Sequence, residues 1–121
     1  MILHNALKSE WNAEKGTGKY GRAAIQKDGF LHCATDETFM KFVREKLVGQ
    51  EADKVMLTID PAKLKSELKW EVGRRATFPH IYGLLNVDAV TRVEELREYI
   101  ARMEKKNQSV SESQQNDAIG I

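Results

Sequence analysis

Two short runs of the chain carry the side chains best suited to chemistry. They are residues 29–35 (GFLHCAT) and residues 78–83 (FPHIYG). Each predicts a short apolar strand that delivers polar, titratable rings to its end, where α/β and α+β proteins commonly keep their sites. The two runs hold two of the three histidines, His32 and His80, and the third, His4, also follows an apolar pair. These residues predict a site in which imidazole rings meet.

The direction of these side chains follows from strand geometry. Neighbours on a strand face opposite sides, so His32 and Cys33 should point apart. His80 and Tyr82 are two residues apart and should share a face, which places an imidazole beside a phenol. The residue before Pro79 avoids the helical region, so the second run should enter its strand in an extended conformation.

Two catalytic interpretations of these groups make strong demands. Three histidines are enough to bind zinc with a water, but none of their spacings is a metal-binding pair, so we expect no metal site. Cys33 as a nucleophile would need a histidine base, which His32 cannot supply and His4 or His80 could. Inward packing of Cys33 is the simpler interpretation.

A binding cleft uses more of these residues with fewer demands. Histidines and Tyr82 would hold a polar ligand by hydrogen bonds and ring stacking, and Arg74 and Arg75 would be available for phosphate. Residues 15–22 (KGTGKYGR) look like a phosphate loop, but their glycines are crowded and no Ser or Thr follows Lys19. A solvated turn is expected there, with a basic lip over an anionic ligand as the alternative.

Composition sets the class of protein. A chain of 121 residues with 41% hydrophobic residues and a formal charge of +1 should form one domain. It has no apolar run of the ~18 residues that a membrane span needs. A single cysteine excludes an internal disulfide, and the start does not resemble a signal peptide. We expect a cytoplasmic protein that binds a small molecule or nucleotide, not a membrane, and the charge does not exclude nucleic acid.

The first half of the chain predicts a strand and two helices around the first run. Residues 2–4 should form a strand ending at His4, and Ser9 should cap a helix that carries Trp11. Thr35 should cap a helix over residues 36–48. The i, i+3, i+4 spacing predicts that this helix buries Phe39, Phe42, Val43 and Leu47.

The second half predicts strands followed by a helix. Residues 55–59 should be a central strand, and residues 68–72 a strand that exposes Lys69 and Glu71 opposite Leu68, Trp70 and Val72. A last strand is expected over residues 87–93. A helix over residues 94–106 should dock on the domain through an apolar stripe formed by Val93, Leu96, Ile100 and Met103. The polar residues 107–121 should be disordered.

The order of these motifs resembles the DUF952 family. The resemblance rests on residues 29–35 before a helix, 57–64 (LTIDPAKL), Trp70-Glu71, 78–83 and 85–90 (LNVDAV), and it covers roughly residues 2–93. The family is of undetermined function and has been grouped with ADP-ribosyltransferase-like proteins. The resemblance therefore implies an α+β fold with split, mainly antiparallel sheets and packed helices over residues 1–93, followed by the extra C-terminal helix and the tail.

That grouping also implies a ligand and site residues. Proteins of the fold hold NAD in a cleft, which makes NAD the expected cofactor. His4 matches a residue that binds the adenosine ribose, and Phe30, His32 and Thr35 match the position of a group placed against nicotinamide. No glutamate matches the usual one of the third strand, where this chain offers His80 and Tyr82, with Glu71 one strand away.

The resulting hypothesis is an NAD- or nucleotide-binding enzyme with ADP-ribosyl-transfer-like chemistry. His32, His80 and Glu71 are its candidate catalytic residues, and the candidate cofactor-binding residues are His4, Phe30, Thr35, Tyr82 and Arg75. One alternative is a noncatalytic nucleotide-binding module, which would be favoured if Glu71 faced solvent. Another is a protein-interaction subunit or homodimer formed through the C-terminal helix, in which case Leu96 and Ile100 should be exposed in the monomer.

Overall fold

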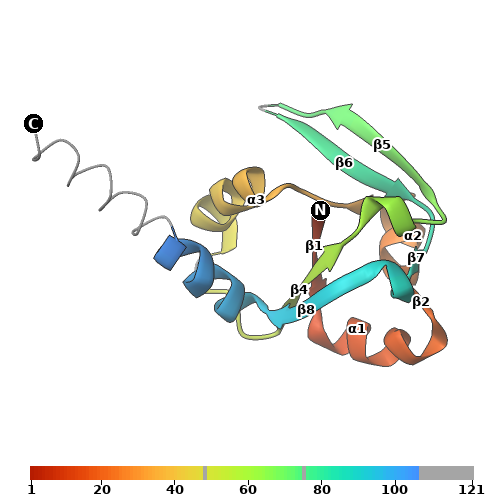
Figure 1. Cartoon of the computed structure of the whole chain (residues 1–121), viewed down its shortest axis with the longest axis horizontal. Coiled ribbons are helices and arrows are strands. Elements are labelled where there is room, and N and C mark those ends of the chain that lie inside the picture. The colour runs from red at the N-terminus through yellow and green to blue at the C-terminus, as the bar shows by residue number, and fades with distance from the viewer. Residues whose placement is uncertain (48, 75, 107–121) are drawn as a thin grey trace, which may run out of the picture.

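The computed structural model describes residues 1–47, 49–74 and 76–106 (Figure 1). The predicted phosphate ligand Arg75 and the tail at 107–121 lie outside the described residues.

Within the described residues, two three-stranded sheets and one two-stranded sheet form the β part of the fold, and their strands pair antiparallel. The first sheet has the order β1 (Ile2–Leu7), β4 (Lys54–Ile59), β8 (Val90–Glu95). The second has the order β3 (Leu31–His32), β6 (Thr77–Tyr82), β5 (Glu67–Val72). The short strands β2 (Lys19–Tyr20) and β7 (Leu85–Asn86) pair separately.

The two larger sheets meet at the segment that follows β3. Leu3 and Ala34 exchange backbone hydrogen bonds of 2.8 and 2.9 Å, and the Cys33 amide donates to the Pro79 carbonyl at 3.1 Å. Residues 33 and 34 therefore connect β6 to the edge of β1. This arrangement confirms the prediction of an α+β fold with antiparallel sheets.

The helices are α1 (Lys8–Glu14), α2 (Arg22–Asp28), α3 (Asp36–Phe42), a π-helical turn at Val43–Leu47 and a helix over residues 96–106. Single 3-10 turns occupy Lys15–Thr17, Pro61–Lys63 and Val87–Ala89. The sequence prediction missed α2 altogether. It was also wrong about the cap of α1, which is Leu7 and not Ser9, and about the start of the last strand and last helix.

The core consists of two clusters on opposite faces of the first sheet. One cluster gathers around Ile2, Leu57 and Ile81, between the two large sheets and α1. The other gathers around Leu3, Met56 and Tyr99, beneath α3 and the last helix. The nearly continuous apolar strand β4 is central and covered on both faces, as predicted.

The buried face of α3 differs from the prediction at one position. Phe39, Val43 and Leu47 are buried as expected, but Phe42 is 44% exposed and Met40 is buried in its place. Phe39, Met40 and Val43 share one face of an α-helix through spacings of one, three and four residues, and Phe42 lies at the edge of that face. Phe42 is thereby left at the side of the helix that faces a cavity.

The face assignment of β5 was right for Leu68 and Lys69 and wrong for the three residues that follow. Trp70 and Val72 are 53% and 87% exposed, whereas Glu71 is partly buried by the rings of β6. β5 is an edge strand, and the hairpin that it forms with β6 extends away from the body of the protein (Figure 1). Its apolar side chains beyond Leu68 therefore have no layer to pack against, although they alternate as a buried face would.

The last helix docks on the domain, as predicted. Leu96 and Tyr99 are fully buried and Met103 is nearly so, while Ile100 is partly buried and Val93 is exposed. The Tyr99 hydroxyl donates to the Asp36 carboxylate at 2.6 Å and ties this helix to the start of α3. The expectation of an exposed Leu96, which the interaction-subunit hypothesis required, is wrong.

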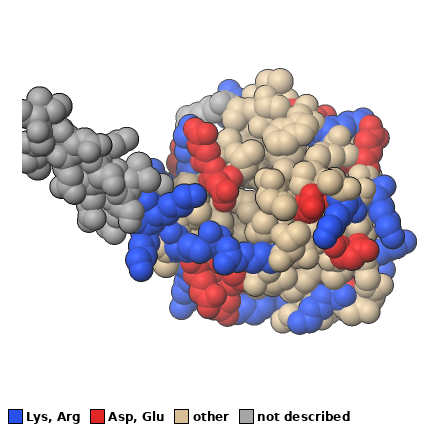
Figure 2. Space-filling view, viewed as in Figure 1, with Lys and Arg blue, Asp and Glu red and all other residues tan. Residues whose placement is uncertain are grey.

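No helix in the described part of the chain is long and apolar enough to cross a membrane. Figure 2 shows uncharged residues over much of the upper and central part of the visible face, with basic and acidic side chains mainly toward its sides.

Candidate functional site

His32 and His80 form the centre of the candidate site. They are register partners on β3 and β6, so their side chains leave the same face of the sheet, and their ring centroids are 5.3 Å apart in an edge-to-face arrangement. Phe30 stacks on the His80 ring at 4.3 Å and also contacts His32 and Tyr82. The structure thus brings together four rings that the sequence placed in two separate runs.

Glu71 joins this cluster from β5. Its Oε1 accepts a hydrogen bond from His80 Nδ1 at 2.8 Å and another from the Tyr82 hydroxyl at 2.5 Å. These bonds, with Tyr82 contributing most and His80 next, hold the pKa of the Glu71 carboxyl below its usual range. The pKa of Tyr82 is raised, mainly because ionisation would remove the hydrogen that its hydroxyl donates to Glu71, and further because of burial and repulsion by the same carboxylate. Glu71 is therefore the charged acceptor, and both of its partners are donors.

His32 has a carboxylate partner of its own. Its Nε2 lies 3.2 Å from Oδ2 of Asp28, the last residue of α2. Gly21 starts α2 close to β3: it has φ of 113°, and a Cβ there would lie 2.7 Å from a methyl group of Leu31. A glycine is therefore needed for α2 to approach the strand that carries His32.

His4 lies under the site and is bonded within the protein. Its Nδ1 donates to the His32 backbone carbonyl at 2.7 Å, which leaves Nε2 of the neutral ring to accept from the Tyr20 hydroxyl at 3.5 Å. Burial disfavours the charged imidazole and lowers the pKa of His4. His4 holds the backbone of His32 in place, and its predicted contact with an adenosine ribose stays a prediction.

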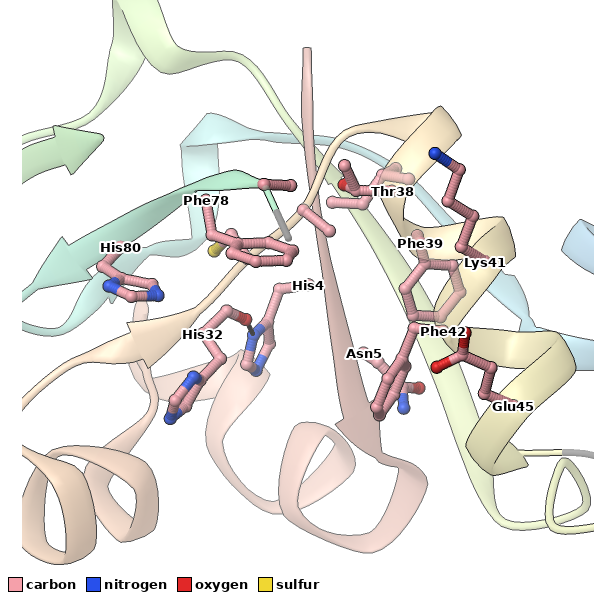
Figure 3. A pocket seen from close by; sticks show the side chains of 14 residues that line it. His4, Asn5, His32, Thr38, Phe39, Lys41, Phe42, Glu45, Phe78 and His80 are labelled. Atoms are coloured by element: carbon pink, nitrogen blue, oxygen red, sulfur yellow. Dashed lines mark hydrogen bonds between the residues drawn. The ribbon is translucent and has the colours of Figure 1, made fainter. Parts of the chain in front are cut away.

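A cavity of about 720 Å³ opens beside the histidines. Figure 3 shows His4, His32, Phe78 and His80 on one side of it, and Thr38, Phe39, Lys41, Phe42 and Glu45 of α3 and the following turn on the other. Leu3, Asn5, Cys33 and Ala34 complete the lining. Its size lies within the range of about 300–1,000 Å³ that is common for ligand sites. Its lining is largely apolar and aromatic, with polar rings on one side and charges on the other.

Two other predicted residues, Thr35 and Arg74, lie outside the lining of the cavity. Thr35 caps α3, because its hydroxyl oxygen accepts from the Thr38 amide at 3.3 Å, so its predicted cofactor contact would have to share that oxygen. Arg74 is exposed at the tip of the β5–β6 hairpin.

The two demanding catalytic interpretations find no support in this geometry. Burial raises the pKa of the Cys33 thiol to about 12, so it is a poor nucleophile and packs inward as expected. Within the described ranges, no group of three His, Cys, Asp or Glu side chains is arranged to hold a metal ion.

Several residues of the site were missed from the sequence. Phe78 precedes His80 by two residues, so strand alternation alone could have placed it on the same face. Asp28 could not have been found, because a spacing of four residues places side chains together only within a helix, and a turn at Gly29 separates Asp28 from the strand of His32. Phe42 and Lys41 could not, because only the packing of α3 against β1 brings them to the cavity.

The family model for a protein of unknown function, DUF952, matches residues 5–93, and the chain belongs to that family. No curated protein matches this chain.

Solved structures of one protein, CC0527 from Caulobacter crescentus, are similar. Its crystal structure has a TM-score of 0.68 and 35% sequence identity, with 78% of this chain and 83% of that chain covered. Its solution NMR structure has a TM-score of 0.65 at the same identity and coverage.

Proposed function

We propose that this protein binds NAD or a related nucleotide in the cavity between α3 and the histidine face of β3 and β6, and acts on it as an enzyme. The observation that carries the proposal is that one cavity is lined both by aromatic side chains and by the paired imidazoles of His32 and His80. A dinucleotide has planar rings, which suit Phe39, Phe42 and Phe78. It also has ribose hydroxyls, which suit His32.

Charge at the opposite wall suits the remaining part of such a ligand. Lys41 lines the cavity, and its ammonium is 4.0 Å from Glu37 in an exposed pair, an interaction that contributes little and leaves the cation available to a diphosphate. The ADP-ribosyltransferase-like grouping belongs to the same proposal, and the split antiparallel sheets agree with it.

The contact between Glu71 and His80 favours an enzyme over a noncatalytic module. A carboxylate that orients an imidazole at the wall of a cavity is a common catalytic arrangement. A module that only bound nucleotides would not need it.

A thermal-shift titration with NAD, ADP-ribose and nicotinamide tests the proposal. A ligand at a hundred times its dissociation constant adds about 2.7 kcal/mol of stability, which is easily detected. We expect NAD to stabilise the wild type, and we expect His32→Ala and Phe42→Ala to lose most of that shift. The His32 side chain is 62% exposed and Phe42 is 44% exposed, so both variants should fold.

The matched control is Val72→Thr, at an exposed position whose side chain points away from the cluster. It should keep the full shift. The proposal is wrong if none of the three compounds stabilises the wild type, or if the two cavity variants respond as the control does.

A further inference from the structure

We infer that His80 is a general base that takes a proton through Nε2 from a hydroxyl nucleophile, with Glu71 and Tyr82 as positioning residues. The inference rests on the proposed function for the identity of the electrophile. It adds the group that moves the proton and the class of nucleophile.

The hydrogen bonds of His80 fix which nitrogen is the base. A carboxylate only accepts hydrogen bonds, so the 2.8 Å contact with Glu71 requires the hydrogen of neutral His80 to be on Nδ1. Nε2 then carries the lone pair. Among the described residues, none donates a hydrogen bond to that nitrogen, and His80 lines the cavity. A proton donor on a bound reactant is the partner that this nitrogen lacks.

The surroundings of His80 keep its ring in one orientation. Phe30 covers one face of the imidazole at 4.3 Å with an interplanar angle of 30°, and His32 meets it edge to face. Tyr82 holds the same Glu71 oxygen that His80 uses, and the Lys69 ammonium lies 4.7 Å from the centre of the Tyr82 ring. Glu71 of β5 is thus held by two side chains of β6, and it orients the imidazole of His80 in turn.

His32 is less suited to the same task. Its Nε2 faces Asp28, and its side chain is 62% exposed, against 16% for His80. Water can reach the His32 ring from outside the cavity, whereas His80 is enclosed by the other rings. The general base is therefore assigned to His80, and His32 to ligand contact.

The reaction follows from a single base. With NAD, a hydroxyl group gives its proton to Nε2 of His80 while its oxygen forms a bond to C1′ of the nicotinamide ribose. The bond from C1′ to the nicotinamide nitrogen breaks, and its electron pair leaves with the neutral nicotinamide ring. Because that leaving group needs no proton, a single base suffices. With water, the products are ADP-ribose, nicotinamide and one proton.

Turnover and binding are measured separately to test the inference. His80→Asn keeps an N–H near the position of Nδ1 but removes the base, so it should retain the NAD thermal shift and lose nicotinamide release by about 10²–10⁴-fold. Glu71→Gln should lose less, because the ring can still act as a base in part of the molecules. Val72→Thr, beside Glu71 and pointing away from it, should release nicotinamide at the wild-type rate.

The class of nucleophile is tested with methanol in the same assay. A hydroxyl nucleophile predicts methyl ADP-ribose in addition to ADP-ribose, both formed through His80. Nicotinamide release by His80→Asn at the wild-type rate would overturn the inference and leave NAD binding intact. Binding without turnover in the wild type would overturn it too, and would favour the noncatalytic module.

The tautomer of His80 gives a readout that does not need NAD. In ¹⁵N NMR spectra of the neutral ring, we expect the wild type to carry its proton on Nδ1, and Glu71→Gln to show a mixture of tautomers. If no nucleotide binds, the proposed function fails, while this result still supports the oriented base. A proton on Nε2 in the wild type would overturn the inference whatever the protein binds.

Discussion

His4 lies where the two large sheets meet, and it is neutral because of its position. Both ring nitrogens are bonded inside the protein, and the charged form would lose its hydration without gaining a carboxylate partner. Its lowered pKa has burial as the main cause, opposed by the hydrogen bond to the His32 carbonyl. At the scale of the residue, this histidine makes the stability of the fold depend on pH.

The sign follows from proton binding. Below its usual value of 6.5, His4 in the unfolded chain takes up a proton that the folded protein excludes, so its contribution to stability is complete above pH 6.5 and is lost as the pH falls further. We expect the denaturant concentration at the unfolding midpoint of the wild type to decrease as the pH is lowered from about 7.5 to about 5.

The control for this prediction is His4→Gln, which cannot titrate in that range. Its midpoint should depend less on pH than that of the wild type. Equal slopes for the two proteins would show that another group causes the pH dependence.

At the scale of the element, α3 connects the first motif to the wall of the cavity. Thr35 and Thr38 cap it reciprocally, since each hydroxyl accepts from the backbone amide of the other, and Asp36 and Glu37 place negative charge in its first turn. The helix carries Phe39 into the core and Phe42 to the cavity. The cap therefore fixes the start of the helix that forms one side of the candidate site.

Removing this cap should weaken the fold by a measurable amount. Thr35→Ala should lower the free energy of unfolding by about 1 kcal/mol, whereas Thr35→Ser, which keeps the hydroxyl, should lose less than half of that. Chemical denaturation measures both. Equal losses for the two variants would mean that the methyl group of Thr35, not its hydroxyl, stabilises the helix.

At the scale of the whole molecule, the first sheet is the middle layer, and the last helix covers one of its faces together with α3. The helix over residues 96–106 lies beyond the part that matches the family model. Its side chains nevertheless share a cluster with Leu3 and Met56 of the sheet. The C-terminal helix is therefore part of the folded core of this chain.

Truncation of a buried side chain on this helix tests that conclusion. Leu96→Ala should lower the free energy of unfolding by about 2–5 kcal/mol, because it leaves a cavity in the core. Val93→Ala, at an exposed position three residues earlier, should change it by less than about 0.5 kcal/mol. Similar small effects of both would place the helix outside the cooperative unit.

Much of the fold could be predicted because periodicity reports burial. The apolar strand at β4, the capped start of α3, the docking stripe of the last helix and the opposed directions of His32 and Cys33 all follow from spacings of two, three or four residues. The helix α2 was not predicted, because none of its residues is buried and its sequence has no clear apolar stripe.

The candidate site divides in the same way. The sequence by itself determined that two histidines, a phenol and a phenylalanine leave their strands near the strand ends, because side-chain direction along a strand is local. Only the tertiary structure decided that Glu71 turns toward them. Trp70 and Val72 alternate as well as any buried pair, and the sequence therefore favoured burying their face of β5. In the structure β5 is the edge strand of a hairpin that extends from the body, so the face with Trp70 and Val72 meets solvent. The Glu71 carboxylate lies on the other face, where it contacts His80. Alternation tells which residues share a face, but what covers each face depends on the layers packed around the sheet.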